Sequence, residues 1–298
     1  MSHIFLRRKK IYPGAFFGSI LVNGILLCGA AICVLPVLHI LAVSFSANGP
    51  ANANLVGLWP IEFNLRAYNE VARDSKMVAA LIQSFKRILL GVPINMLLTI
   101  LCAYPLSHYK EDFPLRTLYS GIVVFTMLFS GGLIPYYILI NRLHLMDTLW
   151  ALVLPGIPVF NVIIMMNFFR QIPSEIREAA SIDGANHFSI LIKIILPISG
   201  AVISTLTLFC FVAHWNAWFD ALIFLKDMAK QPLQNYIRTQ IVRMVTSPDF
   251  EEAKRLAFIA RRSLLFARIF VSIVPIIVIY PFLQKYFRKG IVIGAVKG

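Results

Sequence analysis

The sequence predicts an all-α, polytopic membrane protein with six transmembrane helices, and two observations carry that prediction. Of the 298 residues, 58% are hydrophobic and only 14% are charged, whereas soluble globular chains are about 45–50% apolar and about 25% charged. Apolar runs recur along the chain, and each is long enough to supply the roughly 20 residues that a membrane helix needs. The runs are continuous and do not alternate with period two, which favours helices over the strands of a membrane barrel.

Each span is bounded by charged residues or by turn-forming sequence. No charge occurs between Lys10 and Glu62, and Asn-Gly-Pro at 48–50 is typical of a turn, so the first span is expected at about 14–45. This run exceeds the roughly 7–15 residues of a signal-peptide core, so we expect it to be retained as a membrane helix. The other spans are expected at about 88–109, 117–141, 148–169, 194–219 and 263–284.

Several residues inside these runs need an explanation. Arg268 lies near the outer end of the sixth run, where its side chain is expected to reach the membrane interface. Prolines in the runs are read either as kinks that shape helix packing or as hinges for alternating access. They are Pro36, Pro93, Pro155, Pro158 and Pro275.

Both termini are predicted to lie on the cytoplasmic side. Basic residues divide almost evenly between the two sides of the membrane, so their count does not fix the orientation. The basic clusters at 7–10 and 285–289, however, flank the first and sixth spans on the same side, as an even number of spans requires. The resulting N-in, C-in topology leaves two outer segments, at about 47–87 and 220–262.

The outer segments are expected to contain further helices. Leu65, Tyr68 and Val71 have helical spacing, which predicts a short helix on the outer face. The stretch 230–262 is also compatible with a helix and is rich in basic residues. It is read either as a solvated face near lipid head groups or as a rim that receives an acidic ligand or an extracytoplasmic binding protein.

Composition also argues against other classes of protein. The formal charge is +14, but no basic run interleaved with aromatics marks a nucleic-acid-binding domain. The four cysteines lie inside apolar runs and match neither a disulfide framework nor a metal motif. They are Cys28, Cys33, Cys102 and Cys210.

The polar stretch between the fourth and fifth runs predicts a docking helix over about 173–185. Pro173 suits the first turn of a helix, Glu175 complements the helix dipole there, and Gly184 is a stop signal. One helical face is expected to hold Ile176, Ala179, Ala180 and Asp183, and the small alanines would allow another surface to approach closely. A second helical run is expected from about 188 into the fifth span.

This stretch resembles the signature of ABC importer permeases known as the EAA motif. The matching residues are Glu178-Ala179-Ala180-x-x-Asp183-Gly184-Ala185, followed by Ile194-x-Leu196-Pro197. Two positions depart from the pattern, because Leu191 replaces the usual aromatic residue and Ala201 a common second proline. The resemblance implies that Glu178, Ala179, Ala180, Asp183, Gly184 and Ala185 couple this chain to an ATPase.

Other motifs resemble a narrower branch of the maltose-type carbohydrate-uptake permeases. They match the second permease subunit of importers for lipo-oligosaccharides and complex polysaccharides, a branch that includes uptake systems for pectin fragments and alginate. The motifs are Trp215-Asn216-Ala217-Trp218-Phe219, Ser130 to Tyr137, Tyr280 to Lys285, and Gly294 to Gly298.

The resemblance implies a subunit that works only within an assembly in the bacterial cytoplasmic (inner) membrane. The implied partners are a homologous permease, two ATPase subunits and an extracytoplasmic solute-binding protein. The chain has no Gly-rich loop ending in Gly-Lys-Ser/Thr and no recognisable catalytic constellation. We therefore expect it not to be an enzyme and to hold no cofactor, with ATP and Mg²⁺ bound by the partner ATPase.

The substrate pathway is expected to use polar and aromatic residues inside the spans. The candidates are Asn95, Asn161, Asn167, His214, Trp215, Asn216 and Trp218. Each asparagine or histidine could instead form an interhelical hydrogen bond, which is a usual fate of such side chains in membranes. The basic outer segment suits an acidic oligo- or polysaccharide.

Two other classes of protein remain as alternatives. An ion-coupled secondary transporter usually buries a carboxylate or histidine at mid-membrane and often shows an inverted repeat. No carboxylate lies within a predicted span here. A structural or assembly subunit would not need the docking helix.

Overall fold

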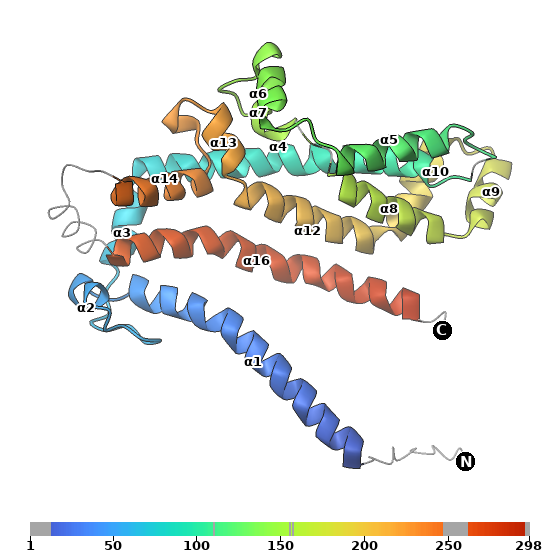
Figure 1. The fold of residues 1–298 in the computed structure, drawn as a ribbon. Helices are drawn as coiled ribbons and strands as arrows, with labels where there is room; N and C mark the ends of the chain where they lie inside the picture. Colours follow the sequence, from blue (N-terminus) through green and yellow to red (C-terminus); the bar gives the residue numbers. More distant parts are fainter. Residues whose placement is uncertain (1–12, 110, 155, 157, 247–261, 296–298) are drawn as a thin grey trace. The chain divides into compact units, whose positions relative to one another are not determined.

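A computed structural model describes residues 13–109, 111–154, 156, 158–246 and 262–295, and these residues are almost wholly helical where they form regular structure (Figure 1). The basic cluster at 7–10, residues 247–261 of the basic stretch 230–262, and the last three residues lie outside the described ranges. The chain divides into two compact units. The first comprises Met1–Val71 and Asp249–Phe270, and the second comprises Ala72–Pro248 and Val271–Gly298.

The first unit is built on the long helix α1 (Pro13–Ser44) and the short helix α2 (Asn48–Asn52). Its core consists of Ala42, Val43, Ala51 and Val56. The short helix expected around 65–71 forms as α3 (Arg66–Arg73). Its Tyr68 hydroxyl lies 2.8 Å from the Ser44 hydroxyl oxygen, so a hydrogen bond ties the C-terminal end of α1 to α3.

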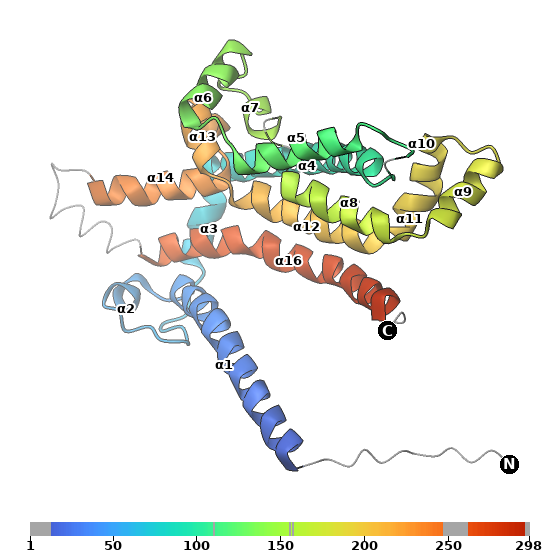
Figure 2. The same ribbon diagram turned by 45° about the vertical axis from the view of Figure 1, so that its right-hand side comes forward.

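The second unit is organised around α4 (Ser75–Leu106). Asp74 caps this helix, because its carboxylate accepts hydrogen bonds from the amides of Lys76 and Met77 at 3.1 and 3.2 Å. The helix therefore begins 13 residues before the predicted span, which started at about 88. Two helices pack along it, α8 (Val159–Gln171) and α12 (Gly200–Asn216), and they lie side by side with it in Figures 1 and 2.

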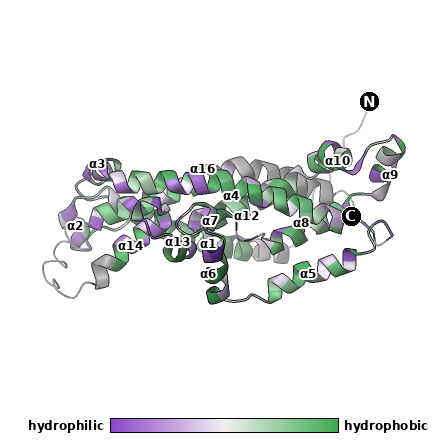
Figure 3. Ribbon diagram, turned by 90° about the horizontal axis from the view of Figure 1, so that it is seen from above, coloured by the Kyte–Doolittle hydropathy of each residue, from purple (hydrophilic) through white to green (hydrophobic). Residues whose placement is uncertain are grey.

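Three helices in the described residues are long and apolar enough to cross a membrane. They are Gly18–Ser44 within α1, Ser75–Leu106, and Arg262–Pro281 within α16 (Arg262–Ala295). They correspond to the first, second and sixth predicted spans. Hydrophobic residues run along the helices of the second unit, whereas hydrophilic residues collect on α3 and on α9 (Ser174–Ile182), which lies in the predicted docking region (Figure 3).

The third and fourth predicted spans are not continuous helices, which corrects the expectation at 117–141 and 148–169. Helices α5 (Arg116–Leu128) and α6 (Leu133–Arg142) meet at an angle of 111°. The chain turns there because Phe129 is extended and Gly132 has φ +83°, a conformation that favours glycine. In the fourth span, α7 (Trp150–Val153) and α8 are separated by a segment containing Gly156 at φ +131°.

The fifth predicted span, 194–219, is also interrupted. It contains a π-helical turn, Leu191–Ile195, then α11 (Leu196–Ile198), and a bend of 84° at Ser199 before α12. Pro197 lacks an amide hydrogen and cannot continue a regular α-helical hydrogen-bond ladder, which fits the wide turn just before it. In each of the two bent helix pairs, the two helices are long and apolar enough to cross a membrane only when taken together.

Candidate functional site

The predicted docking helix forms as α9 (Ser174–Ile182), inside the expected range 173–185. Pro173 is its N-cap residue and not its first helical residue, and Glu175 lies in the first turn. The helix ends in a Schellman motif. Gly184 has φ +81° and donates its amide to the Ser181 carbonyl at 3.0 Å, while the Ala185 amide donates to the Ala180 carbonyl at 2.9 Å.

The two adjacent alanines of α9 face in different directions. Ala180 is buried against the protein, whereas Ala179 is exposed together with Glu178, Asp183 and Gly184, and Ala185 is half-buried. Ile182 is 86% exposed on the same helix. Ala180 thus packs α9 against its own chain, and the surface available to a partner consists of the exposed residues.

Arg177 fastens α9 to the end of α8. Its guanidinium donates to the Phe169 carbonyl at 2.9 Å and to the Ile172 carbonyl at 3.5 Å. These carbonyls belong to the last turn of α8 and its C-cap, where backbone acceptors lack partners within the helix. Helix α9 is therefore bonded directly to a helix of the bundle.

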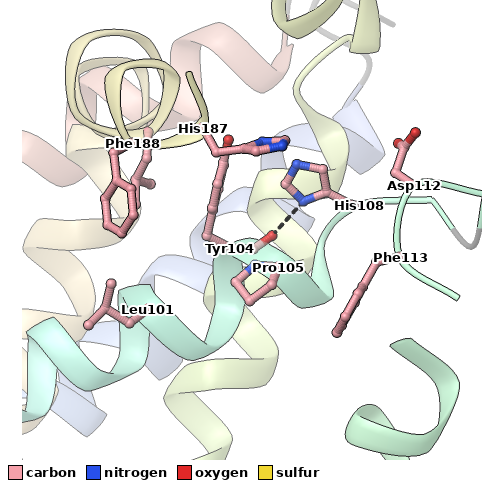
Figure 4. Close-up of a pocket in the computed structure, with 9 residues that line it drawn as sticks. Leu101, Tyr104, Pro105, His108, Asp112, Phe113, His187 and Phe188 are labelled. Carbon is pink, nitrogen blue, oxygen red and sulfur yellow. Dashed lines mark hydrogen bonds between the residues drawn. The ribbon is translucent and has the colours of Figure 1, made fainter. Parts of the chain in front are cut away.

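A cavity of about 310 Å³ opens beside the residues that follow α9 (Figure 4). It lies between the end of α4 and α10 (His187–Ile190) and is lined mostly by apolar side chains. The rings of His108 and His187 meet edge to face at its rim, with centroids 5.7 Å apart. The His108 Nδ1 atom lies 3.0 Å from the Tyr104 carbonyl oxygen, which fixes the orientation of that ring.

A buried ionic cluster lies farther back along α4, in the half of the helix that begins at Ser75. The Arg87 side chain is 3% exposed and forms an ion pair with Asp220 on α13 (Phe219–Phe224). Its remaining contacts reach the carbonyls of Leu152 and Ala217, at 3.4 and 3.5 Å, and the Nδ1 atom of His214 at 3.3 Å. One guanidinium therefore joins α4, α7, α12 and α13.

His214 extends this cluster along α4. Its Nε2 atom lies 2.9 Å from the carboxamide nitrogen of Asn95. The imidazole also sits directly on Gly91, where a Cβ atom would come within 2.6 Å of the ring. Glycine at this position lets α4 and α12 approach closely enough for the polar contacts to form.

The predicted pathway residues fall into two groups. Asn95, Asn161, His214 and Trp215 are buried in helix contacts: Asn161 lies 3.3 Å from the Cys210 sulfur, and the Trp215 indole donates to the Ser272 carbonyl at 2.9 Å. Asn167 and Asn216 are exposed and Trp218 is half-buried. The structure thus joins Asn95 and His214 but does not gather all seven around one point.

Sequence reasoning missed the ion pair because it treated Arg87 and Asp220 as the edges of spans. The two residues are 133 positions apart, so no spacing rule connects them. Only a weak indication that these two residues pair was present in the sequence. Each charge directly adjoins an apolar run, where a charged side chain is stable only with a partner or at the interface.

Comparisons with known proteins agree with this architecture. Residues 71–293 match the family model described as "Binding-protein-dependent transport system inner membrane component". The chain is 39% identical over 282 residues to the polygalacturonan/rhamnogalacturonan transport system permease protein YtcP of Bacillus subtilis (strain 168), covering 94% of this chain and 98% of that protein. It is 38% identical over 269 residues to protein LplC of the same organism, with 90% of each chain covered.

A solved structure has the same fold. The crystal structure of a bacterial ABC transporter involved in the import of the acidic polysaccharide alginate matches with a TM-score of 0.82 and 29% sequence identity. The match covers 93% of this chain and 99% of the solved chain. The overall fold of this chain has therefore been observed experimentally.

Proposed function

The chain belongs to the family of inner membrane components of binding-protein-dependent transport systems, and we propose that it is the permease subunit through which an ATP-driven importer takes up uronate-containing polysaccharide fragments. The family assignment confirms the resemblance seen in the sequence and replaces the alternative of an ion-coupled secondary transporter. The observation that carries the proposal is that α9, in a chain of this family, is capped and exposes one face to solvent. The subunit itself is not an enzyme.

We propose that α9 docks on the ATPase of the assembly. Its exposed residues Glu178, Ala179 and Ile182 offer a charge beside a small and an apolar side chain. The Schellman motif and Arg177 support this surface from within the chain, so it is organised before a partner binds. ATP and Mg²⁺ would be bound by the ATPase, and this chain would need no cofactor.

Docking from the cytosol would set the topology. With α9 inside, six crossings and an N-in, C-in arrangement follow if the bent pair α5–α6, the pair α7–α8 and the interrupted segment α10–α12 each count as one crossing. The subunit would reside in the bacterial cytoplasmic membrane. A second permease, two ATPase subunits and an extracytoplasmic binding protein would complete the importer.

The substrate class is supported by two relatives. One is named for polygalacturonan and rhamnogalacturonan transport, and the matching solved structure is of a transporter for the acidic polysaccharide alginate. A chain with a net charge of +14 suits the import of an anionic saccharide, because long-range attraction raises the rate at which an acidic ligand arrives.

Charge reversal on the docking helix tests the proposed coupling. The whole assembly, reconstituted in proteoliposomes with Glu178→Lys, is expected to lose ATP-dependent uptake of oligogalacturonate and to retain less ATPase on purification. Glu111→Lys, an exposed site outside α9, is the matched control and should behave as wild type. Intact ATPase association and intact uptake in the Glu178→Lys assembly would refute coupling through α9.

A further inference from the structure

The turn between α12 and α13 is held in place from inside the protein. Ala217 is extended, Trp218 precedes α13, and Arg87 binds both the Ala217 carbonyl and the Asp220 carboxylate. These contacts fix the backbone on both sides of Trp218. The turn lies at the end of α12 away from the docking segment, about 25 Å along a helix of 17 residues.

A second arginine covers the tryptophan of this turn. The guanidinium carbon of Arg238, on α14 (Leu233–Thr246), lies 3.5 Å from the centroid of the Trp218 ring. Arg238 is exposed, and no carboxylate among the described residues forms an ion pair with it. The two arginines of this region therefore differ, since Arg87 is buried and neutralised and Arg238 is exposed and stacked.

Stacking leaves the hydrogen-bonding edge of a guanidinium available. The guanidinium carbon lies over the indole ring, and the N–H donors of a guanidinium point outward in its own plane. A carboxylate can bind such an edge with two parallel hydrogen bonds. The stacked indole restricts the side chain, so less conformational entropy is lost when an anion binds.

We propose that Arg238 and Trp218 form a recognition element for the carboxylate of a uronic acid unit at the outer end of the translocation pathway. This inference rests on the proposed function and adds to it the residues that select an acidic sugar. The guanidinium edge binds the sugar carboxylate. Asn216, exposed at the end of α12, is placed on the same turn and supplies an amide for the sugar hydroxyls.

The proposal is specific to the carboxylate, so a substrate that differs only in that group provides the test. The complete wild-type and variant assemblies are compared in proteoliposomes of zwitterionic lipid for uptake of oligogalacturonate and of its fully methyl-esterified form. The measured quantity is the initial uptake rate of oligogalacturonate divided by that of the methyl-esterified form, at limiting substrate concentration. Any preference of the binding protein affects wild type and variants equally and cancels in the comparison.

Arg238→Gln is expected to lower this ratio about tenfold, which corresponds to about 1.4 kcal/mol, because charge-assisted hydrogen bonds to the carboxylate are lost. Arg238→Lys should recover part of the ratio, and Trp218→Leu should lower it by less than Arg238→Gln. Lys226→Gln removes an equal charge from an exposed site in the same unit and should leave the ratio unchanged.

Three outcomes would overturn the proposal and leave the proposed function standing. Equal losses for both forms of the sugar would show a purely structural pair, and an unchanged ratio would show no role in selection. An effect that appears only when anionic lipid is added would assign Arg238 to lipid phosphate. A wild-type assembly that hydrolyses ATP but imports neither sugar would instead refute the proposed substrate class, and the role of the pair with it.

Discussion

Removing the negative partner from the ion pair between Arg87 and Asp220 should destabilise the helix bundle measurably. Asp220→Asn leaves the Arg87 guanidinium without its counter-charge. The Arg87 side chain is 3% exposed, and the Asp220 side chain is 29% exposed. Breaking a fully buried pair costs about 3–5 kcal/mol. Because Asp220 is partly hydrated and the amide can still accept one hydrogen bond, we expect a cost near the lower limit, about 3 kcal/mol.

A double-mutant cycle isolates the pairing from other losses. Arg87→Met should cost about 2 kcal/mol, because the Asp220 carboxylate can be hydrated while two carbonyls lose a donor. With the guanidinium already absent, the second change to Asp220→Asn should cost almost nothing. The expected coupling free energy is therefore about 3 kcal/mol.

Reversible unfolding of the purified subunit in mixed micelles, with sodium dodecyl sulfate as denaturant and helicity as readout, gives these free energies. Asp227→Asn is the matched control, since Asp227 is exposed and caps the Ala229 amide at 2.8 Å. Its effect should stay within about 0.5 kcal/mol. A coupling free energy below about 0.5 kcal/mol would refute the idea that the pair holds four elements together.

Three further predictions follow from local geometry. Gly91→Ala should destabilise the subunit by about 1–3 kcal/mol in the same unfolding assay, because the new Cβ would meet the adjacent imidazole at 2.6 Å. Gly184→Ala should cost about 1 kcal/mol, because φ is +81° there, and should weaken ATPase binding in a pull-down. Lys230→Met should lower the apparent melting temperature by an amount that salt reduces and that is constant between about pH 5 and 9. The Lys230 ammonium lies 2.6 Å from the Asp147 carboxylate and holds the pKa of that carboxyl below its usual 3.8, while the same contact raises the pKa of Lys230 above 10.5. The stabilisation is thus present above pH 3.8 and lost as pH falls through the lowered Asp147 pKa, and it is present below pH 10.5 and lost as pH rises through the raised Lys230 pKa.

Matched variants decide these predictions. Gly121→Ala, on a helix with open space around the position, should be neutral or slightly stabilising, and equal losses at both glycines would contradict the contact argument. Gly184→Asn should retain more stability than Gly184→Ala, since asparagine tolerates the left-handed conformation better. A Lys230→Met effect that is insensitive to salt would exclude a mainly electrostatic contribution.

Features set by local sequence were predictable. Gly184, the acidic first turn and the helical spacing from Ile176 to Asp183 placed α9 correctly to within a few residues, because capping and periodicity act over one or two turns. The first span was equally clear. The Asn48-Gly49-Pro50 turn sequence marked the end of the helix within a longer charge-free run, and α1 covers Pro13–Ser44.

Features set by tertiary packing were not predictable from one sequence. Hydropathy measures composition over a window, so it cannot distinguish a continuous span at 117–141 from two helices that meet at 111°. The direction of Ala180 depends on what α9 packs against. The number of crossings and their orientation, and the roles of the seven pathway candidates, stay predictions.

Helix α9 is connected to the bundle in two mechanically different ways. On one side, Arg177 bonds α9 to the end of α8, and α8 packs along α4. On the other side, the chain passes through the π-helical turn Leu191–Ile195 and an 84° bend before α12 begins. We therefore expect a displacement of α9 to be transmitted to α8 and to be absorbed in part before it reaches α12. A movement of an ATPase docked on α9 would then reach the membrane helices mainly through α8.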